Sequence, residues 1–223
     1  MAVQRQLRGA IFDLDGTIGD SVSVAIEAFR RTYLEFGEKS YTDEEIVATW
    51  GPSEEGVMMR MFPQRWQEAV QVYLSHYDAV HVEQDVAVFE GFDAIFDLFA
   101  RYGVHKAIVT AKGQHSAAIS MRHFGLADQF EIVEHGSPEG VIKGQQIASI
   151  VKLWGISQDE VIYVGDFPSD ISASRQAGVV AVGAAWAPTA DAAVLAEHQP
   201  DYLFTSTSDF KNMLERALVE EKF

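Results

Sequence analysis

The chain has 223 residues, a formal net charge of −16 and no cysteine. This length allows one large core or a core that carries a smaller domain, and the lack of cysteine excludes disulfides, thiolate metal sites and cysteine nucleophiles. Such an acidic chain is poorly suited to nucleic acid or an anionic membrane, so we expect neither as a partner. The first residues contain no apolar stretch of signal-peptide length, and no segment approaches membrane-spanning length, which favours a cytoplasmic protein.

Short apolar runs rich in valine and isoleucine alternate with longer amphipathic stretches. This alternation is typical of a parallel sheet covered by helices. The first predicted strand spans residues 9–14, and residues 21–85 then contain helical patterns without a convincing strand. In chain order, the expected elements of this interval are helices at 22–36, 43–50, 53–61 and 65–80. The strands expected after it lie at 106–110, 131–133, 161–165 and 179–183, with a possible edge strand at 202–205.

These elements predict an α/β fold, a three-layer α/β/α Rossmann-like parallel sheet with a small helical domain inserted after the first strand. The expected core domain comprises residues 1–20 and 86–223, and the expected inserted domain comprises residues 21–85. The hinges between them should lie near residues 19–21 and 82–90.

Two carboxylates, Asp13 and Asp15, stand one residue apart at the end of the first apolar run. Residues i and i+2 of a strand point to the same face, and Gly16 lets the backbone turn abruptly behind them. One carboxylate can then attack as a nucleophile while the other moves a proton. The alternative is a strand that ends in an ordinary Asp-Gly turn.

Thr110 closes the next apolar run and is followed by Ala111. Ligands of a parallel sheet collect at the carboxyl ends of its strands, so this hydroxyl and the following amides are expected to face the same crevice as Asp13. Hydroxyl and free N–H groups at such a turn suit a phosphate oxygen. As an alternative, Thr110 caps the helix that is expected from His115.

Asp166 and Asp170 follow a third apolar run, four residues apart. Together with Asp13 they would gather three carboxylates, which favours a hard cation with oxygen ligands, and Mg²⁺ suits a site shared with phosphate. The alternative for Asp170 is an acid at a helix N-terminus. Lys143, ahead of a helix that runs to Trp154, is either an ordinary solvated cation or the group that holds a phosphoryl group.

The ordered set of Asp13-x-Asp15-Gly16-Thr17, Thr110, Lys143 and Gly165-Asp166-x-x-x-Asp170 resembles the haloacid dehalogenase superfamily of phosphohydrolases. The resemblance covers essentially the whole chain. The inserted helices resemble the small α-helical cap of its phosphoglycolate phosphatase and beta-phosphoglucomutase branch. The chain departs from the branch in Gly144-Gln145-Gln146, which replaces a proline-containing stretch, and in Phe167, where a small hydroxyl residue is frequent.

The resemblance implies a role for each motif residue. Asp13 would be the nucleophile, and Asp15 the general acid and later the general base. Phosphate would be bound by Thr110, Ala111 and Lys143. The implied Mg²⁺ ligands are the side chains of Asp13, Asp166 and Asp170 and the backbone carbonyl of Asp15.

We therefore expect Mg²⁺-dependent hydrolysis of a small phosphate monoester, phosphoglycolate-like or sugar-phosphate-like, through an aspartyl-phosphate. The alternatives are a phosphomutase of the beta-phosphoglucomutase kind and a non-catalytic phosphate-binding module. The expected partner is a small phosphorylated metabolite, and the expected assembly is a monomer or a homodimer.

The cap loop that contains Trp50, Gly51 and Ser53 resembles the specificity loop of this branch, so these residues are expected to contact substrate. Trp50 alternatively packs the interior of the cap. Three cap arginines are either ligands of an anionic leaving group or ordinary exposed side chains: Arg30, Arg31 and Arg60.

Overall fold

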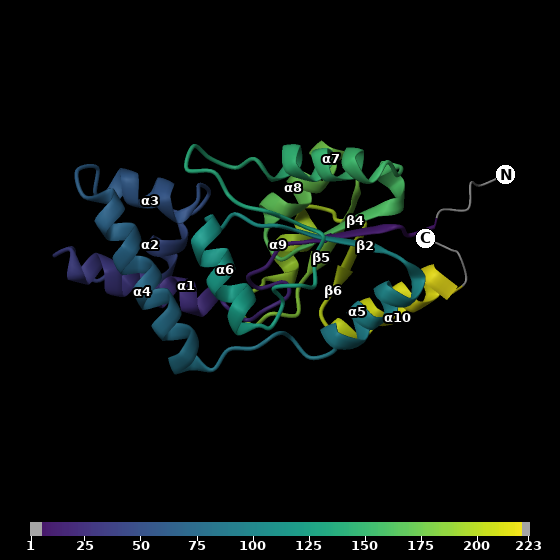
Figure 1. Cartoon of the computed structure of the whole chain (residues 1–223), viewed down its shortest axis with the longest axis horizontal. Helices are drawn as coiled ribbons and strands as arrows, with labels where there is room; N and C mark the ends of the chain where they lie inside the picture. The colour runs from purple at the N-terminus through teal and green to yellow at the C-terminus, as the bar shows by residue number, and fades with distance from the viewer. Residues whose placement is uncertain (1–5, 220–223) are drawn as a thin grey trace.

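The computed structural model of the protein describes residues 6–219. It contains a six-stranded sheet with helices on both faces, and a group of helices, α1–α4, lies beyond one end of the sheet (Figure 1). The predicted α/β fold with a parallel sheet is therefore confirmed. The predicted edge strand is also present, as β6.

The sheet has the strand order β3-β2-β1-β4-β5-β6, and every neighbouring pair is parallel. The chain moves outward from β1 to β3 and then returns to β4 on the other side of β1. Ligands of such sheets bind beyond the carboxyl ends of the strands at this point of reversal. The strands are β1 (Gly9–Phe12), β2 (His105–Val109), β3 (Ile132–Glu134), β4 (Val161–Gly165), β5 (Val180–Ala184) and β6 (Tyr202–Phe204).

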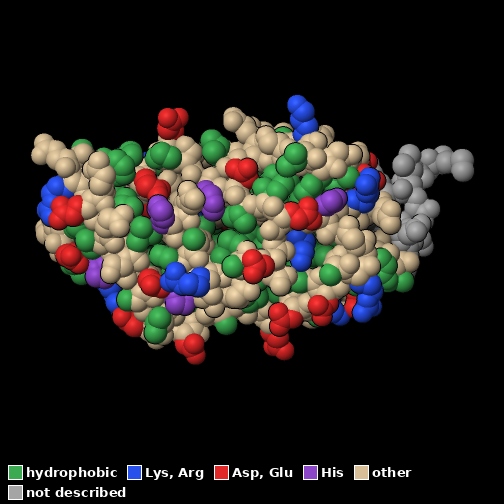
Figure 2. Space-filling view, in the orientation of Figure 1, with side chains coloured by type: hydrophobic (Ala, Val, Ile, Leu, Met, Phe, Trp, Pro, Cys, Tyr) green, Lys and Arg blue, Asp and Glu red, His purple; other side chains and the backbone are tan. Residues whose placement is uncertain are grey.

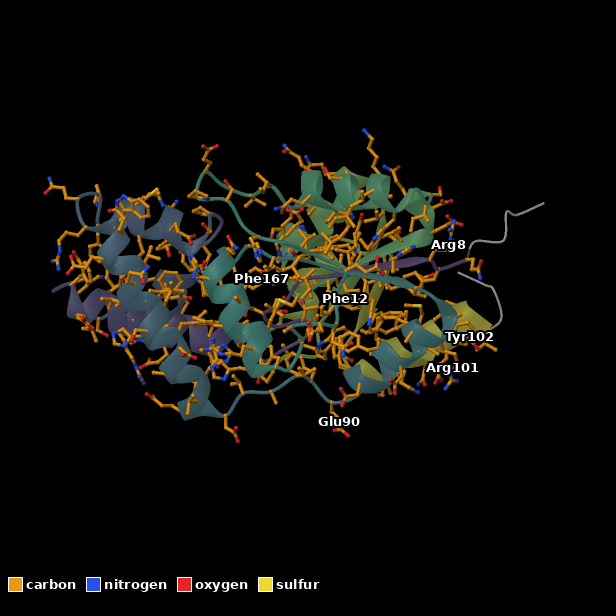
Figure 3. All side chains as sticks on the ribbon, viewed as in Figure 1. Arg8, Phe12, Glu90, Arg101, Tyr102 and Phe167 are labelled. Carbon is orange, nitrogen blue, oxygen red and sulfur yellow. The ribbon has the colours of Figure 1, made fainter. Side chains whose placement is uncertain are left out.

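Alternate residues of β1 enter different hydrophobic clusters. Ala10 and Phe12 pack with α5, α6 and α10, whereas Ile11 packs with α7 and α8. The central position of Phe12 is visible in Figure 3. A strand covered on both faces is apolar throughout, which explains the uninterrupted apolar run of β1. The helices around the sheet are α5 (Phe92–Tyr102), α6 (Gln114–His123), α7 (Lys143–Trp154), α8 (Pro168–Ala177), α9 (Ala192–Glu197) and α10 (Thr207–Val219), with a short 3-10 turn, η1 (Gln158–Glu160).

The inserted helices have a hydrophobic cluster of their own, built from residues between 22 and 80. Its largest fully buried side chains are Tyr33, Tyr73 and Tyr77. The two connections to the sheet run side by side, because the Asp20 N–H donates to the carbonyl of Ala87 at 3.2 Å. The predicted division into domains at residues 20 and 85 stays a prediction. The inserted helices are α1 (Val22–Glu35), α2 (Asp43–Val47), α3 (Glu54–Met61) and α4 (Trp66–Gln84).

Several predicted boundaries are wrong by a few residues. Strand β1 ends at Phe12 rather than at residue 14, because the carbonyl of Leu14 instead accepts the N–H groups of Ile18 and Gly19 and closes a turn. Helix α2 ends at Val47 instead of residue 50, and α4 continues to Gln84 instead of residue 80. Amphipathic periodicity locates an element better than its ends, which depend on local capping and turn contacts.

Within residues 6–219 no helix combines the length and apolar character needed to cross a membrane. On the face drawn in Figure 2, lysine and arginine side chains are scattered among acidic ones and form no broad basic area. The expectations of no nucleic-acid partner, no membrane partner and a cytoplasmic location stay predictions.

Candidate active site

The motif residues meet at the carboxyl ends of the central strands. Asp13 follows β1, Thr110 follows β2 and Asp166 follows β4. A cavity of about 290 Å³ lies between this edge of the sheet and the inserted helices α1–α4. All five predicted catalytic and phosphate-binding residues line this cavity: Asp13, Asp15, Thr110, Ala111 and Lys143.

Lys143 joins two of the predicted acids. Its Nζ lies 2.8 Å from Asp13 Oδ2 and 2.7 Å from Asp170 Oδ1, and its side chain is buried at the start of α7. Burial disfavours the charged ammonium, but the two carboxylates outweigh this effect and raise the pKa of Lys143 well above its ordinary value. Burial raises the pKa of Asp13 to about 6, against the opposing influence of Lys143. The structure therefore excludes the reading of Lys143 as a solvated surface cation.

Asp13, Asp166 and Asp170 each offer an oxygen within 4.8 Å of the others. Asp166 Oδ1 accepts a hydrogen bond from the Thr17 hydroxyl at 3.0 Å, whereas Oδ2 is buried and has no hydrogen-bond partner among the described residues. Burial, reinforced by the neighbouring carboxylates, raises the pKa of Asp166 well above its ordinary value. An orphaned oxygen in an all-carboxylate cluster suits a hard divalent cation, so the residues fit the predicted kind of metal.

Asp170 belongs both to this cluster and to the start of α8. Its Oδ2 accepts the backbone N–H of Phe167 at 3.0 Å, and its Oδ1 faces Lys143. The two sequence readings of Asp170, as a helix N-terminal acid and as a member of an acid cluster, are therefore both correct. Its position at N3 lets one carboxylate cap the helix and face the site.

Gly16 makes the close approach of the β1 turn and β4 possible. Its φ is +70°, in the left-handed region that favours glycine, as the Asp-Gly turn predicts. A Cβ at this position would overlap the carboxylate of Asp166. The turn therefore fixes the backbone conformation and also leaves the space that Asp166 occupies.

Thr110 does not cap a helix. Helix α6 begins at Gln114 with Gly113 as its N-cap, so the alternative reading of Thr110 is wrong. Its hydroxyl instead accepts the backbone N–H of Lys112 at 3.3 Å inside the turn after β2. Thr110 and Ala111 both line the cavity.

Asp15 has two side-chain partners that sequence reasoning missed. Its Oδ1 accepts the hydroxyl of Ser21, and its Oδ2 lies 3.0 Å from the Nζ of Lys112. Lys112 is buried, and Glu54 of α3 lies on its other side at 3.7 Å. The sequence contains a signal for Lys112, because a strongly acidic chain needs local cations at an acid cluster and Lys112 stands two residues after Thr110.

Of the predicted cap contacts, Trp50 and Gly51 line the cavity. The ring centroids of Trp50 and Phe167 lie 6.2 Å apart. Phe167 is labelled in Figure 3, between the inserted helices and the sheet. Ser53 is not among the lining residues, because its hydroxyl donates to Glu55 at 2.6 Å and its N–H donates to the carbonyl of Ser137.

The three cap arginines do not line the cavity either. Arg30 pairs with Glu27 and Asp43, and Arg31 pairs with Glu27 and Glu83. The guanidinium of the third, Arg60, donates to the carbonyl of Thr49. The structure therefore favours the reading of these arginines as ordinary surface side chains.

Comparisons with known proteins agree with this geometry. Residues 10–184 match the family of haloacid dehalogenase-like hydrolases. Pyrophosphatase PpaX of Anoxybacillus flavithermus is 27% identical over 214 residues, which cover 92% of this chain and 95% of that protein. PpaX of Bacillus pumilus is 29% identical over 210 residues, which cover 89% of this chain and 92% of that protein.

Two solved structures share the fold. A haloacid dehalogenase-like family hydrolase from Streptococcus pneumoniae has a TM-score of 0.74 at 24% identity, with 94% of this chain and 98% of that chain covered. CbbY from Rhodobacter sphaeroides, in complex with phosphate, has a TM-score of 0.74 at 15% identity, with 90% of this chain and 94% of that chain covered. The chain belongs to the haloacid dehalogenase-like hydrolase family.

Proposed function

We propose that this protein is a magnesium-dependent phosphatase that hydrolyses a small-molecule phosphate monoester through an aspartyl-phosphate on Asp13. The observation that carries the proposal is the pair of carboxylates on the cavity wall, Asp13 and Asp15, with the ammonium of Lys143 2.8 Å from Asp13. Asp13 can attack the phosphorus atom while Lys143 binds the phosphoryl oxygens. Asp15 can give a proton to the leaving oxygen.

In the first step the Asp13 carboxylate attacks phosphorus, and the bond from phosphorus to the ester oxygen breaks. Asp15 gives its proton to that oxygen, and the alcohol leaves. Lys143 and the polar groups of Thr110 and Ala111 hold the phosphoryl oxygens in line with Asp13. In the second step Asp15 takes a proton from water, the water oxygen attacks phosphorus, and the bond from phosphorus to Asp13 breaks, releasing phosphate.

The Mg²⁺ would be held by the side chains of Asp13, Asp166 and Asp170 and by the backbone carbonyl of Asp15. When bound, it would neutralise negative charge on the phosphoryl oxygens. The unpartnered oxygen of Asp166 supports this assignment. The expected substrate classes are phosphoglycolate-like and sugar-phosphate-like esters, and the pyrophosphatase relatives add pyrophosphate to the substrates worth testing.

The test is release of inorganic phosphate from a panel of small phosphomonoesters, with Mg²⁺ or with a chelator. The native protein should release phosphate only with the metal, and Asp13→Asn should abolish release. Asp128→Asn changes an exposed aspartate in the loop before β3 and should retain native activity. No release by the native protein from any substrate would overturn the proposal, and a sugar bisphosphate assay would then test the phosphomutase.

A further inference from the structure

The two halves of the cavity wall differ in chemistry. The sheet contributes the acids and Lys143, whereas the inserted helices contribute a mainly apolar surface that includes Val22, Phe29 and Val57. In the proposed reaction the phosphoryl group occupies the sheet side, so the leaving group must lie against the inserted helices. The charge on that side of the cavity therefore decides which leaving groups are accepted.

Lys112 and Lys143 are the lysines among the described lining residues, and no arginine is among them. Lys143 is engaged by Asp13 and Asp170, so Lys112 is left as the cation that could meet an anionic leaving group. The charge of Lys112 is already matched by Glu54 at 3.7 Å, and Asp15, the proton donor of the proposed reaction, lies 3.0 Å from the same ammonium.

Glu54 is held firmly in this position. It begins α3 on the inserted helices, but its carboxylate reaches across to the start of α6. Oε2 accepts the N–H of Gly113 at 2.5 Å, and Oε1 accepts the hydroxyl of Ser116 at 2.7 Å. The residue is only 7% exposed. The carboxylate of Glu54 is thus held beside the cavity by two hydrogen-bond donors and by the ammonium of Lys112.

We infer that Glu54 is a specificity-determining residue, which neutralises Lys112 and thereby selects phosphate esters with an uncharged, largely apolar leaving group. The inference rests on the proposed phosphatase function and narrows its substrate class, because it makes phosphoglycolate and pyrophosphate, both named above as candidates, poor substrates. A leaving group with a carboxylate or a second phosphate would bring negative charge toward Glu54 and Asp15 with no unpaired cation among the lining residues. An uncharged group instead gains from contact with the apolar wall.

A pair of substrates of equal shape isolates the effect of charge. Phosphoglycolate carries a carboxylate on its leaving group, and the phosphate ester of glycolamide carries an uncharged amide in the same place. The native protein should have a kcat/KM for the amide that is about tenfold or more above that for phosphoglycolate, and pyrophosphate should be poorer than methyl phosphate.

Glu54→Gln keeps the size of the side chain and one acceptor oxygen, which can accept the N–H of Gly113, but removes the charge. The hydroxyl of Ser116 must then rotate to accept from the new amide nitrogen. The substitution should lower the preference for the amide by about tenfold, because Lys112 then keeps only Asp15, the proton donor of the proposed reaction, beside it and can attract the carboxylate of the leaving group. Adding Lys112→Met to that variant should restore the preference. The matched control is Glu83→Gln, which removes an acid paired with Arg31 outside the cavity and should leave the preference unchanged.

Equal kcat/KM for the two esters in the native protein would overturn the inference without affecting the proposed function. A Glu54→Gln variant that loses activity equally toward both esters would assign Glu54 a purely structural role and would also overturn it. If Glu54→Gln fails to fold, the ratio of kcat/KM for the two esters in the native protein still tests whether the cavity prefers an uncharged leaving group. Absence of phosphate release from every substrate would instead count against the proposed function itself.

Discussion

Lys143 is the buried cation that lies between two acids of the site. Its buried ammonium lies between Asp13 and Asp170, whose carboxylates would otherwise repel each other in a region of low dielectric constant. The same three groups therefore link the proposed reactivity of Asp13 to the stability of the fold. Activity and stability are coupled at this residue, and one substitution can test both.

We predict that Lys143→Met abolishes phosphate release and lowers the free energy of unfolding by about 3–5 kcal/mol in the absence of metal, because it leaves two buried carboxylates uncompensated. Urea denaturation measures the loss, and added Mg²⁺ should reduce it. Lys152→Met, an exposed change on the same helix, is the control and should alter neither quantity. Equal stability of the two variants would show that Lys143 does not balance the acids.

At the level of elements, the packing of α4 against α6 joins the inserted helices to the sheet. His81 of α4 stacks on His123 of α6, with ring centroids 4.8 Å apart, and its Nε2 lies 3.3 Å from the Ser120 hydroxyl. Its Nδ1 has no hydrogen-bond partner among the described residues. This contact therefore favours an uncharged imidazole.

Burial lowers the pKa of His81 to about 4, and Lys112 and His123 act in the same direction against the smaller opposite effects of Asp15 and Asp78. The folded protein then binds fewer protons here than the unfolded chain, whose histidine titrates near 6.5. Stability must fall as the pH drops from about 6.5 toward 4.

We predict that the native protein loses about 1–2 kcal/mol more of its free energy of unfolding between pH 7 and pH 5 than His81→Phe does. The variant keeps an aromatic ring between Tyr77 and His123 but has no proton to gain. Denaturation curves at the two pH values measure the difference. Identical pH dependence in both proteins would contradict the assignment.

For the whole molecule, the proposed metal site at the three-acid cluster predicts that metal raises global stability. A ligand that binds only the folded state stabilises it by about 2.7 kcal/mol at 100 times its dissociation constant. For a chain of this size that corresponds to a rise in Tm of about 5–10 °C. Saturating Mg²⁺ should therefore raise the Tm of the native protein, and a chelator should reverse the rise.

Asp166→Asn should abolish this metal-dependent rise, while Asp128→Asn should keep it. Without metal, Asp166→Asn should be no less stable than the native protein, because the change removes a buried negative charge next to Asp13 and Asp170. Thermal unfolding with and without metal measures both effects. The same rise in all three proteins would place the metal elsewhere.

Much of the molecule follows from local patterns in the sequence. The apolar run that ends at Phe12 predicts a buried central strand, and the interval between β1 and β2 predicts helices alone. The acids after β1 and β4 must then meet, because parallel strands end at one edge of the sheet. The sequence thus determined the fold class and the positions of Asp13 and Asp166 at that edge.

Only the tertiary structure decided the electrostatic partners. Lys112 and Glu54 are far apart in the chain, and they meet because α3 packs near the start of α6. Ser53, one residue before Glu54, instead turns its hydroxyl to Glu55. Strand periodicity is a local property that the chain carries by itself, whereas contacts between the inserted helices and the sheet depend on how separate hydrophobic clusters pack together.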